Sequence, residues 1–190
     1  QVYLAERQAT GALLDYYRTV MGQSFDLAIK AIKRFARLDA ARFRLRDALR
    51  AEAIVSQLKS FGSAYIEAGT IHYFLLPLLR RRLPKQVAVK PVFLAHEALK
   101  SLGEIGHLYG PGDWLTLLYI FHPNHSDKLR EDILAARSLV YSKLIAKEEF
   151  SIDLKNYPHV RDEFYTIKIV EQLDLQDCRR LFPLIRTLKT

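Results

Sequence analysis

The spacing of apolar residues over the first 60 positions constrains the fold more than any other feature of this sequence. Gly11 and Gly22 are the only glycines there, and apolar residues recur every three or four positions. This is the period of one face of an α-helix, so the pattern predicts a helical N-terminal third. We expect one helix that begins at Ser24, a break between residues 38 and 41, and a second helix that ends near Leu58.

The charge of the chain favours an anionic partner. Lys and Arg total 29 against 21 for Asp and Glu, which gives a net charge of +8. The helix after Ser24 carries four cations on its outward face: Lys30, Lys33, Arg34 and Arg37. The next predicted helix aligns three arginines four residues apart: Arg42, Arg46 and Arg50. Like charges on one helical face repel each other, so these stripes predict either a solvated surface or contact with an anionic group.

The middle of the chain predicts a change from helix to sheet. Residues 64–68 form a short apolar stretch that ends at Gly69, residues 73–83 form a helix closed by Pro84, and residues 86–94 form a second apolar stretch. Two strands joined by a helix of this length are most economically parallel, with a right-handed crossover. We therefore predict a helix-rich α/β fold with a small parallel sheet flanked by helices.

The second half of the chain is predicted to be mainly helical. The segment from Asp113 to Phe121 fits a helix and a buried strand equally well, whereas Ser126 and Asp127 predict the start of a long helix. No internal repeat, low-complexity tract or flexible linker is visible, so residues 1–190 are predicted to form a single domain. The chain opens without a methionine, which fits the C-terminal part of a longer protein.

The sequence argues against several classes of protein. A single cysteine, Cys178, excludes an internal disulfide and fits a reducing compartment, so we expect a cytoplasmic protein unless a targeting signal lies outside this chain. The apolar stretch at residues 114–121 is far shorter than the ~20 residues of a membrane helix, so no membrane span is predicted. The motifs of serine hydrolases, Walker-type nucleotidases, dinucleotide-binding enzymes and zincins are absent. The sequence does not decide whether the chain is an enzyme.

The end of the first predicted strand is the strongest candidate site. In an open parallel sheet, ligands bind beyond the carboxyl ends of the strands, where helix N-termini attract anions. Four residues are predicted to meet there: Arg46, Glu67, Gly69 and His72. Glu67 needs a partner in so apolar a strand, and His72 or an arginine would supply one. His96 and Glu97 follow the second strand and reach the same edge of the sheet by topology.

His122 and His125 form a separate candidate metal site. With Asp127 they would offer two imidazoles and a carboxylate to zinc, manganese or iron. Pro123 prevents the helical spacing that places both rings on one face. A turn before a helix capped by Ser126 is therefore the competing interpretation.

Residues 46–83 also resemble part of a known superfamily. Its members combine an Arg-Asp or Arg-Asn pair that opens a helix, a short hydrophobic strand, a Gly-x-x-His turn and a further helix leading to another strand. The chain matches these parts in order, with Arg46-Asp47, residues 64–68 and Gly69-Thr70-Ile71-His72. The superfamily includes the TraB pheromone-shutdown proteins, the Tiki membrane proteases, the ChaN-type haem-binding lipoproteins and the erythromycin esterases. The resemblance covers about residues 46–94. It implies an α/β fold, a divalent metal or haem as cofactor, His72 as a ligand and Arg46 as a charge-stabilising residue.

The resemblance leaves two functional hypotheses. Residues 1–45 contain no histidine and no earlier strand, so half of the superfamily's site is missing. The chain is then either the C-terminal piece of a longer protein or a divergent member. The first hypothesis is a TraB/ChaN-like domain whose strand-end site binds a divalent metal, haem or an anionic ligand. The alternative is a non-catalytic basic helical module that binds nucleic acid, although no recognition motif is present, or a protein partner. In that case the apolar residues 2–21 would form an interface or an oligomer contact.

Overall fold

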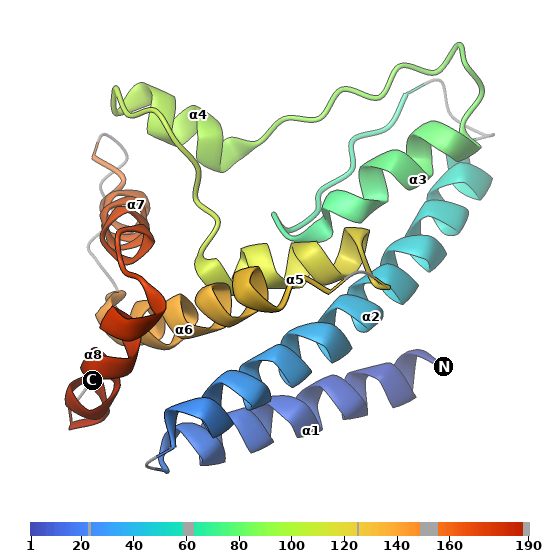
Figure 1. The fold of residues 1–190 in the computed structure, drawn as a ribbon. Helices are drawn as coiled ribbons and strands as arrows, with labels where there is room; N and C mark the ends of the chain where they lie inside the picture. The colour runs from blue at the N-terminus through green and yellow to red at the C-terminus, as the bar shows by residue number, and fades with distance from the viewer. Residues whose placement is uncertain (23, 59–62, 125, 149–155, 188–190) are drawn as a thin grey trace.

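The computed structural model describes residues 1–22, 24–58, 63–124, 126–148 and 156–187. Every regular element within these residues is helical. In chain order they are α1 (Val2–Val20), α2 (Phe25–Leu58), the short 3-10 helix η1 (His72–Phe74), α3 (Leu75–Arg82), α4 (Leu94–Ser101), α5 (Pro111–Phe121), α6 (Lys128–Leu144), α7 (Pro158–Glu171) and α8 (Leu175–Thr187). Helices α1 and α2 run antiparallel, and α5 and α6 lie on the other side of α2 (Figure 1).

Helix α2 is the axis on which the other helices pack. It has 34 residues and is about 50 Å long at the usual rise per residue. Its buried side chains follow the helical period over most of its length: Phe25, Ala28, Ile29, Ile32, Ala36, Ala40, Phe43, Asp47 and Ala51. Helix α2 contacts α1, α5 and α6, and its C-terminal half also contacts α3. One continuous helix therefore links two packing regions.

The break predicted between residues 38 and 41 is wrong. Ala40 is 1% exposed and continues the buried stripe from Ala36 to Phe43. The guanidinium of Arg42 lies 2.6 Å from the carboxylate of Asp39 and stabilises the same turn. The stretch contains neither glycine nor proline, so nothing in the backbone opposes a continuous helix.

The main core lies where α2, α5, α6 and α8 meet. Leu115 and Ile120 of α5 are fully buried, and Ala135 and Ala136 of α6 join the same cluster. The small alanine side chains allow these helices to approach closely. The segment that fitted either a helix or a strand is thus a helix. It begins with Pro at its first position, and the Asp113 carboxylate accepts a hydrogen bond from the Gly110 amide.

The parallel sheet is absent from the described residues, so the predicted α/β fold class is wrong. Residues 63–69 contain neither helix nor strand and are exposed, with Tyr65 at 85%. The second predicted strand contains Pro91, which lacks a backbone donor for a strand ladder, and its last residue, Leu94, already belongs to α4. Helix α3 packs against the C-terminal half of α2 in a small apolar cluster and so has no sheet to cover.

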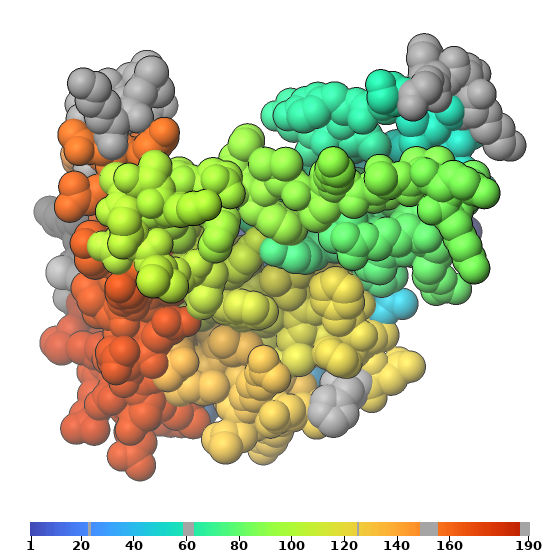
Figure 2. Space-filling view, turned by 90° about the horizontal axis from the view of Figure 1, so that it is seen from above, coloured from blue at the N-terminus to red at the C-terminus, as the bar shows by residue number. Residues whose placement is uncertain are grey.

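Residues 84–93 and α4 form a continuous band across the molecule (Figure 2). The ring of Phe93 stacks on the ring of Tyr73, with a centroid separation of 5.1 Å. Ring stacking therefore fixes this band where a strand ladder was expected.

Helix α1 keeps an apolar outer face. Ala9 and Ala12 are buried, whereas Tyr3, Leu14 and Met21 are exposed. An interface through residues 2–21 stays a prediction. No helix in the described part of the chain, α1 included, is long and apolar enough to cross a membrane.

We expect Leu115→Ala to lower the free energy of unfolding by about 2–5 kcal/mol, because it opens a cavity at a side chain with no exposure. The matched control is Leu129→Ala on α6, where the side chain is 74% exposed and the change should stay within about 0.5 kcal/mol. Chemical denaturation of both variants measures the difference. Equal losses would contradict the packing of α5.

Candidate functional site

His72 joins η1 to the C-terminal half of α2. Its Nδ1 lies 2.5 Å from Oδ1 of Asp47, and its Nε2 lies 3.0 Å from Nη1 of Arg50. A guanidinium can only donate, so Nε2 accepts from Arg50 and Nδ1–H donates to Asp47. The Asp47 side chain is 0% exposed and the His72 side chain 10%, with the ring of Phe43 packed edge-on. Both ring nitrogens are engaged within the protein and join η1 to α2, whereas Oδ2 of Asp47 is buried without a hydrogen-bond partner among the described residues.

The sequence predicts that Glu67 and Gly69 belong to this site, but neither contributes a side chain to the link at His72. Glu67 is exposed in the irregular segment before η1, and the buried carboxylate beside His72 is that of Asp47. The carbonyl of Gly69 accepts a hydrogen bond from the His72 amide at 3.0 Å. A Cβ at Gly69 would lie 3.7 Å from the His72 ring, an ordinary contact, so this turn does not require glycine.

The arginine stripe on α2 does not converge on a single partner. Arg46 donates to the Glu6 carboxylate on α1 at 3.0 Å. Arg42 binds Asp39 and lies 3.4 Å from Glu6. Arg50 alone reaches His72. The first two arginines therefore fasten α1 to α2, and only the third approaches the predicted site.

The remaining predicted ligands lie elsewhere. His96 and Glu97 are exposed on α4, and no hydrogen bond or ion pair within the described residues joins either to His72. His122 is exposed just after α5, and His125 lies outside the described residues. No group of three or more His, Cys, Asp or Glu side chains in the described part of the chain is arranged to hold a metal ion.

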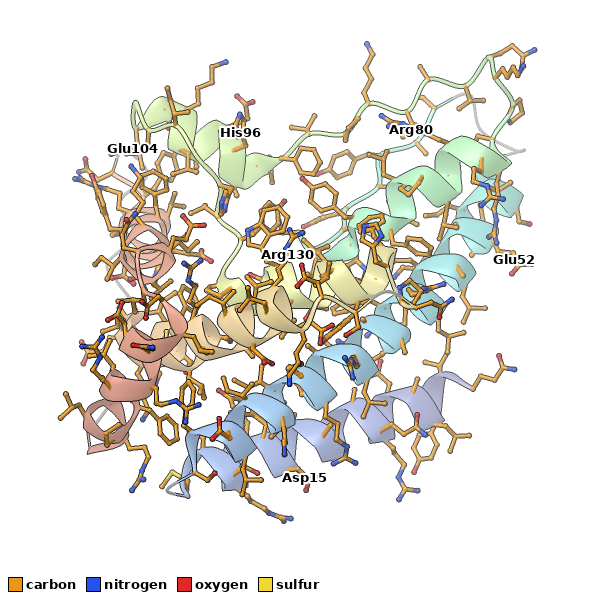
Figure 3. All side chains as sticks on the ribbon, viewed as in Figure 1. Asp15, Glu52, Arg80, His96, Glu104 and Arg130 are labelled. Atoms are coloured by element: carbon orange, nitrogen blue, oxygen red, sulfur yellow. The ribbon has the colours of Figure 1, made fainter. Side chains whose placement is uncertain are left out.

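A basic cleft of about 950 Å³ lies among α1, α2 and the start of α6. Its charged lining consists of five cations, namely Lys30, Lys33, Arg34, Arg37 and Lys128, and two carboxylates, those of Asp26 and Asp132. Asp15, which binds Arg34, lies on the side of the molecule opposite His96 and Arg80 (Figure 3). The cleft is therefore remote from the predicted strand-end site.

The buried carboxylate of Glu131 fixes the floor of this cleft. It is 0% exposed and accepts hydrogen bonds from the Tyr119 hydroxyl at 2.8 Å, the Ser126 hydroxyl at 2.9 Å and the Arg37 guanidinium at 2.8 Å. The ammonium of Lys33 lies 3.0 Å away. Burial alone raises the pKa of Glu131, but these donors outweigh it and lower the pKa to about 2. The carboxylate is therefore ionised at neutral pH.

Two of the cations bind the buried Glu131 carboxylate, although the Arg37 side chain stays 53% exposed, and the other three make no ion pair with Glu131 within the described residues. We call Lys33 and Arg37 the floor cations, because Glu131 binds both. Burial lowers the pKa of the Lys33 ammonium, but hydrogen bonds to Asp132 and Glu131 outweigh it and raise the pKa above its ordinary value. The other three form the exposed rim cations: Lys30, Arg34 and Lys128. The cleft thus has a fixed charged floor and an adaptable rim.

The sequence indicates the cations on one wall of this cleft but does not reveal its buried carboxylate. It placed the α2 cations on one outward face from their spacing, which the structure shows to be the wall of the cleft. It did not find Glu131, because the partners of this side chain come from α2 and α5. No local pattern in α6 marks a glutamate that will be completely buried.

A second cavity, of about 260 Å³, is lined by residues of α5 and α7 and by the segment before η1. Burial raises the pKa of both carboxyl groups in its lining, Asp113 and Glu163. Asp113 caps α5, and Glu163 accepts a hydrogen bond from the Tyr141 hydroxyl at 3.2 Å. Both carboxylates thus have structural partners.

Comparisons with known proteins identify one relative that is described as uncharacterized. No family model matches the chain. No solved structure matches it either. Over 181 residues the chain is 32% identical to an uncharacterized protein of Archaeoglobus fulgidus. This similarity covers 93% of the chain but only 60% of the relative's length. None of the comparisons bears on the resemblance to the TraB and ChaN proteins.

We expect His72→Ala to lower the free energy of unfolding by roughly 3 kcal/mol or more, because it leaves the buried Asp47 carboxylate without its partner. His96→Ala is the matched control, since that imidazole is exposed, and it should change stability by less than about 0.5 kcal/mol. Urea denaturation tests both. If the two variants are equally stable, His72 is not the link between η1 and α2.

The Glu131 carboxylate should give the protein a measurable acid dependence. Its pKa falls from 4.5 to about 2 on folding, which corresponds to about 3 kcal/mol. A lowered pKa stabilises the folded state fully above pH 4.5, and this contribution is lost as the pH falls toward 2. Glu131→Gln should therefore cost about 3 kcal/mol at pH 7 and progressively less below pH 4.5.

Denaturation across this pH range measures the dependence on Glu131. Glu97→Gln, at an exposed position on α4, is the control and should follow the wild-type profile. A constant difference between Glu131→Gln and wild type at every pH would contradict the assignment.

Proposed function

We propose that this chain is a non-catalytic basic helical module that binds an anionic ligand in the cleft among α1, α2 and α6. The observation that carries the proposal is the fixed orientation of the floor cations. The fully buried Glu131 holds Lys33 and Arg37 in place, so these cations lose less conformational entropy when an anion binds. The rim cations keep their solvent exposure and complete the binding surface.

Charge supports an anionic ligand over any other. The cleft carries five cations against two carboxylates, and each carboxylate already has a partner: Asp132 binds Lys33, and Asp26 binds Arg179. The whole chain has a net charge of +8, which would steer anions toward the protein. Lys30 and Lys128 make no salt bridge among the described residues, so an anion would compensate charges that the protein leaves unpaired.

The lining of the cleft supports binding without catalysis. Within the described residues it contains no Ser, Thr, Cys, Tyr or His, and its two carboxylates, those of Asp26 and Asp132, are already paired with cations. Cys178 is buried elsewhere, and burial raises the pKa of its thiol to about 11, so it is a poor nucleophile. An unreactive single thiol also agrees with the cytoplasm as the compartment in this proposal.

Two double variants of equal net charge test the proposal with heparin, a sulfated polyanion. Lys30→Gln/Lys128→Gln removes two rim cations, whereas Lys85→Gln/Lys90→Gln removes two exposed lysines from the band on the opposite side. The slope of log affinity against log salt should fall by about 2 for the cleft variant, because each lysine that meets the polyanion contributes about 1. The band variant should keep the wild-type slope. Equal slopes for the two variants would contradict binding in the cleft.

A further inference from the structure

Within the described residues, carboxylates of the protein bind the rim cations weakly or not at all. Lys30 and Lys128 are exposed and make no salt bridge among the described residues. Arg34 binds Asp15 at 2.7 Å, but both side chains are largely exposed, at 63% and 48%. Exposed pairs of this kind contribute little to stability, so an incoming anion can replace Asp15 at low cost. The rim therefore offers three cations to a ligand.

The cations of the cleft lie close together. On α2 they follow one helical face from Lys30 to Arg37, a span of about 10 Å at the usual rise per residue. Lys128 belongs to the first turn of α6, which meets this face where Lys33 binds Asp132. The volume of about 950 Å³ matches a small-molecule site. These dimensions favour a ligand whose negative charges are concentrated within two turns of helix.

The cleft lacks the features that proteins use to hold nucleic-acid bases. Within the described residues, its lining contains no aromatic side chain on which a base would stack. The Tyr119 ring lies beneath the Arg37 guanidinium at 4.8 Å, and its own exposure is 4%. Phosphoryl groups are recognised by cations alone, whereas single strands are held by cations together with aromatic platforms.

We propose that the cleft binds a compact polyphosphate, a ligand with several linked phosphoryl groups and no requirement for a base. This inference rests on the proposed function and narrows the ligand class of the same site. The floor cations would receive one phosphoryl group in a fixed position, with the planar guanidinium of Arg37 suited to paired hydrogen bonds. The rim cations would close on the neighbouring phosphoryl groups from α2 and α6.

Isothermal titration calorimetry with inorganic tripolyphosphate tests this inference. Inorganic phosphate and a single-stranded DNA oligonucleotide are the comparison ligands, and each is titrated into wild type, Lys30→Gln/Lys128→Gln and Lys85→Gln/Lys90→Gln. Tripolyphosphate should bind at one site, at least roughly tenfold tighter than inorganic phosphate. The cleft variant should weaken it by roughly tenfold or more, and the band variant should not. Circular dichroism checks that every variant is folded.

The comparison ligands separate the two proposals. If the oligonucleotide binds more tightly than tripolyphosphate and loses that affinity in the cleft variant, the polyphosphate inference is overturned while the anion-binding function stands. If no anion loses affinity in the cleft variant, both proposals fail. If tripolyphosphate alone depends on the rim lysines, both are supported.

Discussion

The ionised carboxylate of Glu131, completely buried between α2, α5 and α6, is the interaction on which the structure of the cleft depends. Removing such a charge from water is costly, and only a full set of donors compensates for it. Tyr119 and Ser126 supply two of these donors, and Lys33 and Arg37 supply the others. The same contacts that satisfy Glu131 therefore hold α6 against α2 and fix two cations at the cleft.

A second buried carboxylate, that of Asp47, lies on α2 toward its C-terminal end. There Asp47 accepts from His72 and secures η1 and α3, while Glu131 of α6 secures the N-terminal half. In both places a charged link between helices tolerates no loss of a partner. The two ends of α2 differ in which side chains a ligand can reach. Both nitrogens of His72 are engaged, whereas the rim cations beside Glu131 face solvent, and we therefore place the proposed ligand at this end.

The sequence predicts the helices well where a single face is buried, but it does not reveal how the helices meet. The apolar spacing indicates α1 and most of α2, and Asp127 accepts the expected capping hydrogen bond from the Arg130 amide. The predicted sheet is wrong because residues 64–68 are a short stretch. The pattern of apolar residues in so short a stretch does not indicate whether another strand pairs with it. The same limit applies to the site. The position of His72 after Gly69 is visible in the sequence, but its partner Asp47 belongs to a distant turn of α2, and Glu67 looks equally suitable.

Amide chemical-shift mapping by NMR, with inorganic tripolyphosphate as the probe, is the most direct measurement of where this chain binds an anion. Binding in the cleft predicts saturable shifts concentrated in residues 26–38 of α2 and in the first turn of α6, with little change around η1 and α3. Shifts centred on His72, Arg50 and the start of α3 would place the ligand at the opposite end of α2 and contradict the account. Small shifts distributed over every exposed lysine would contradict it equally, because they would show that the cleft has no preference.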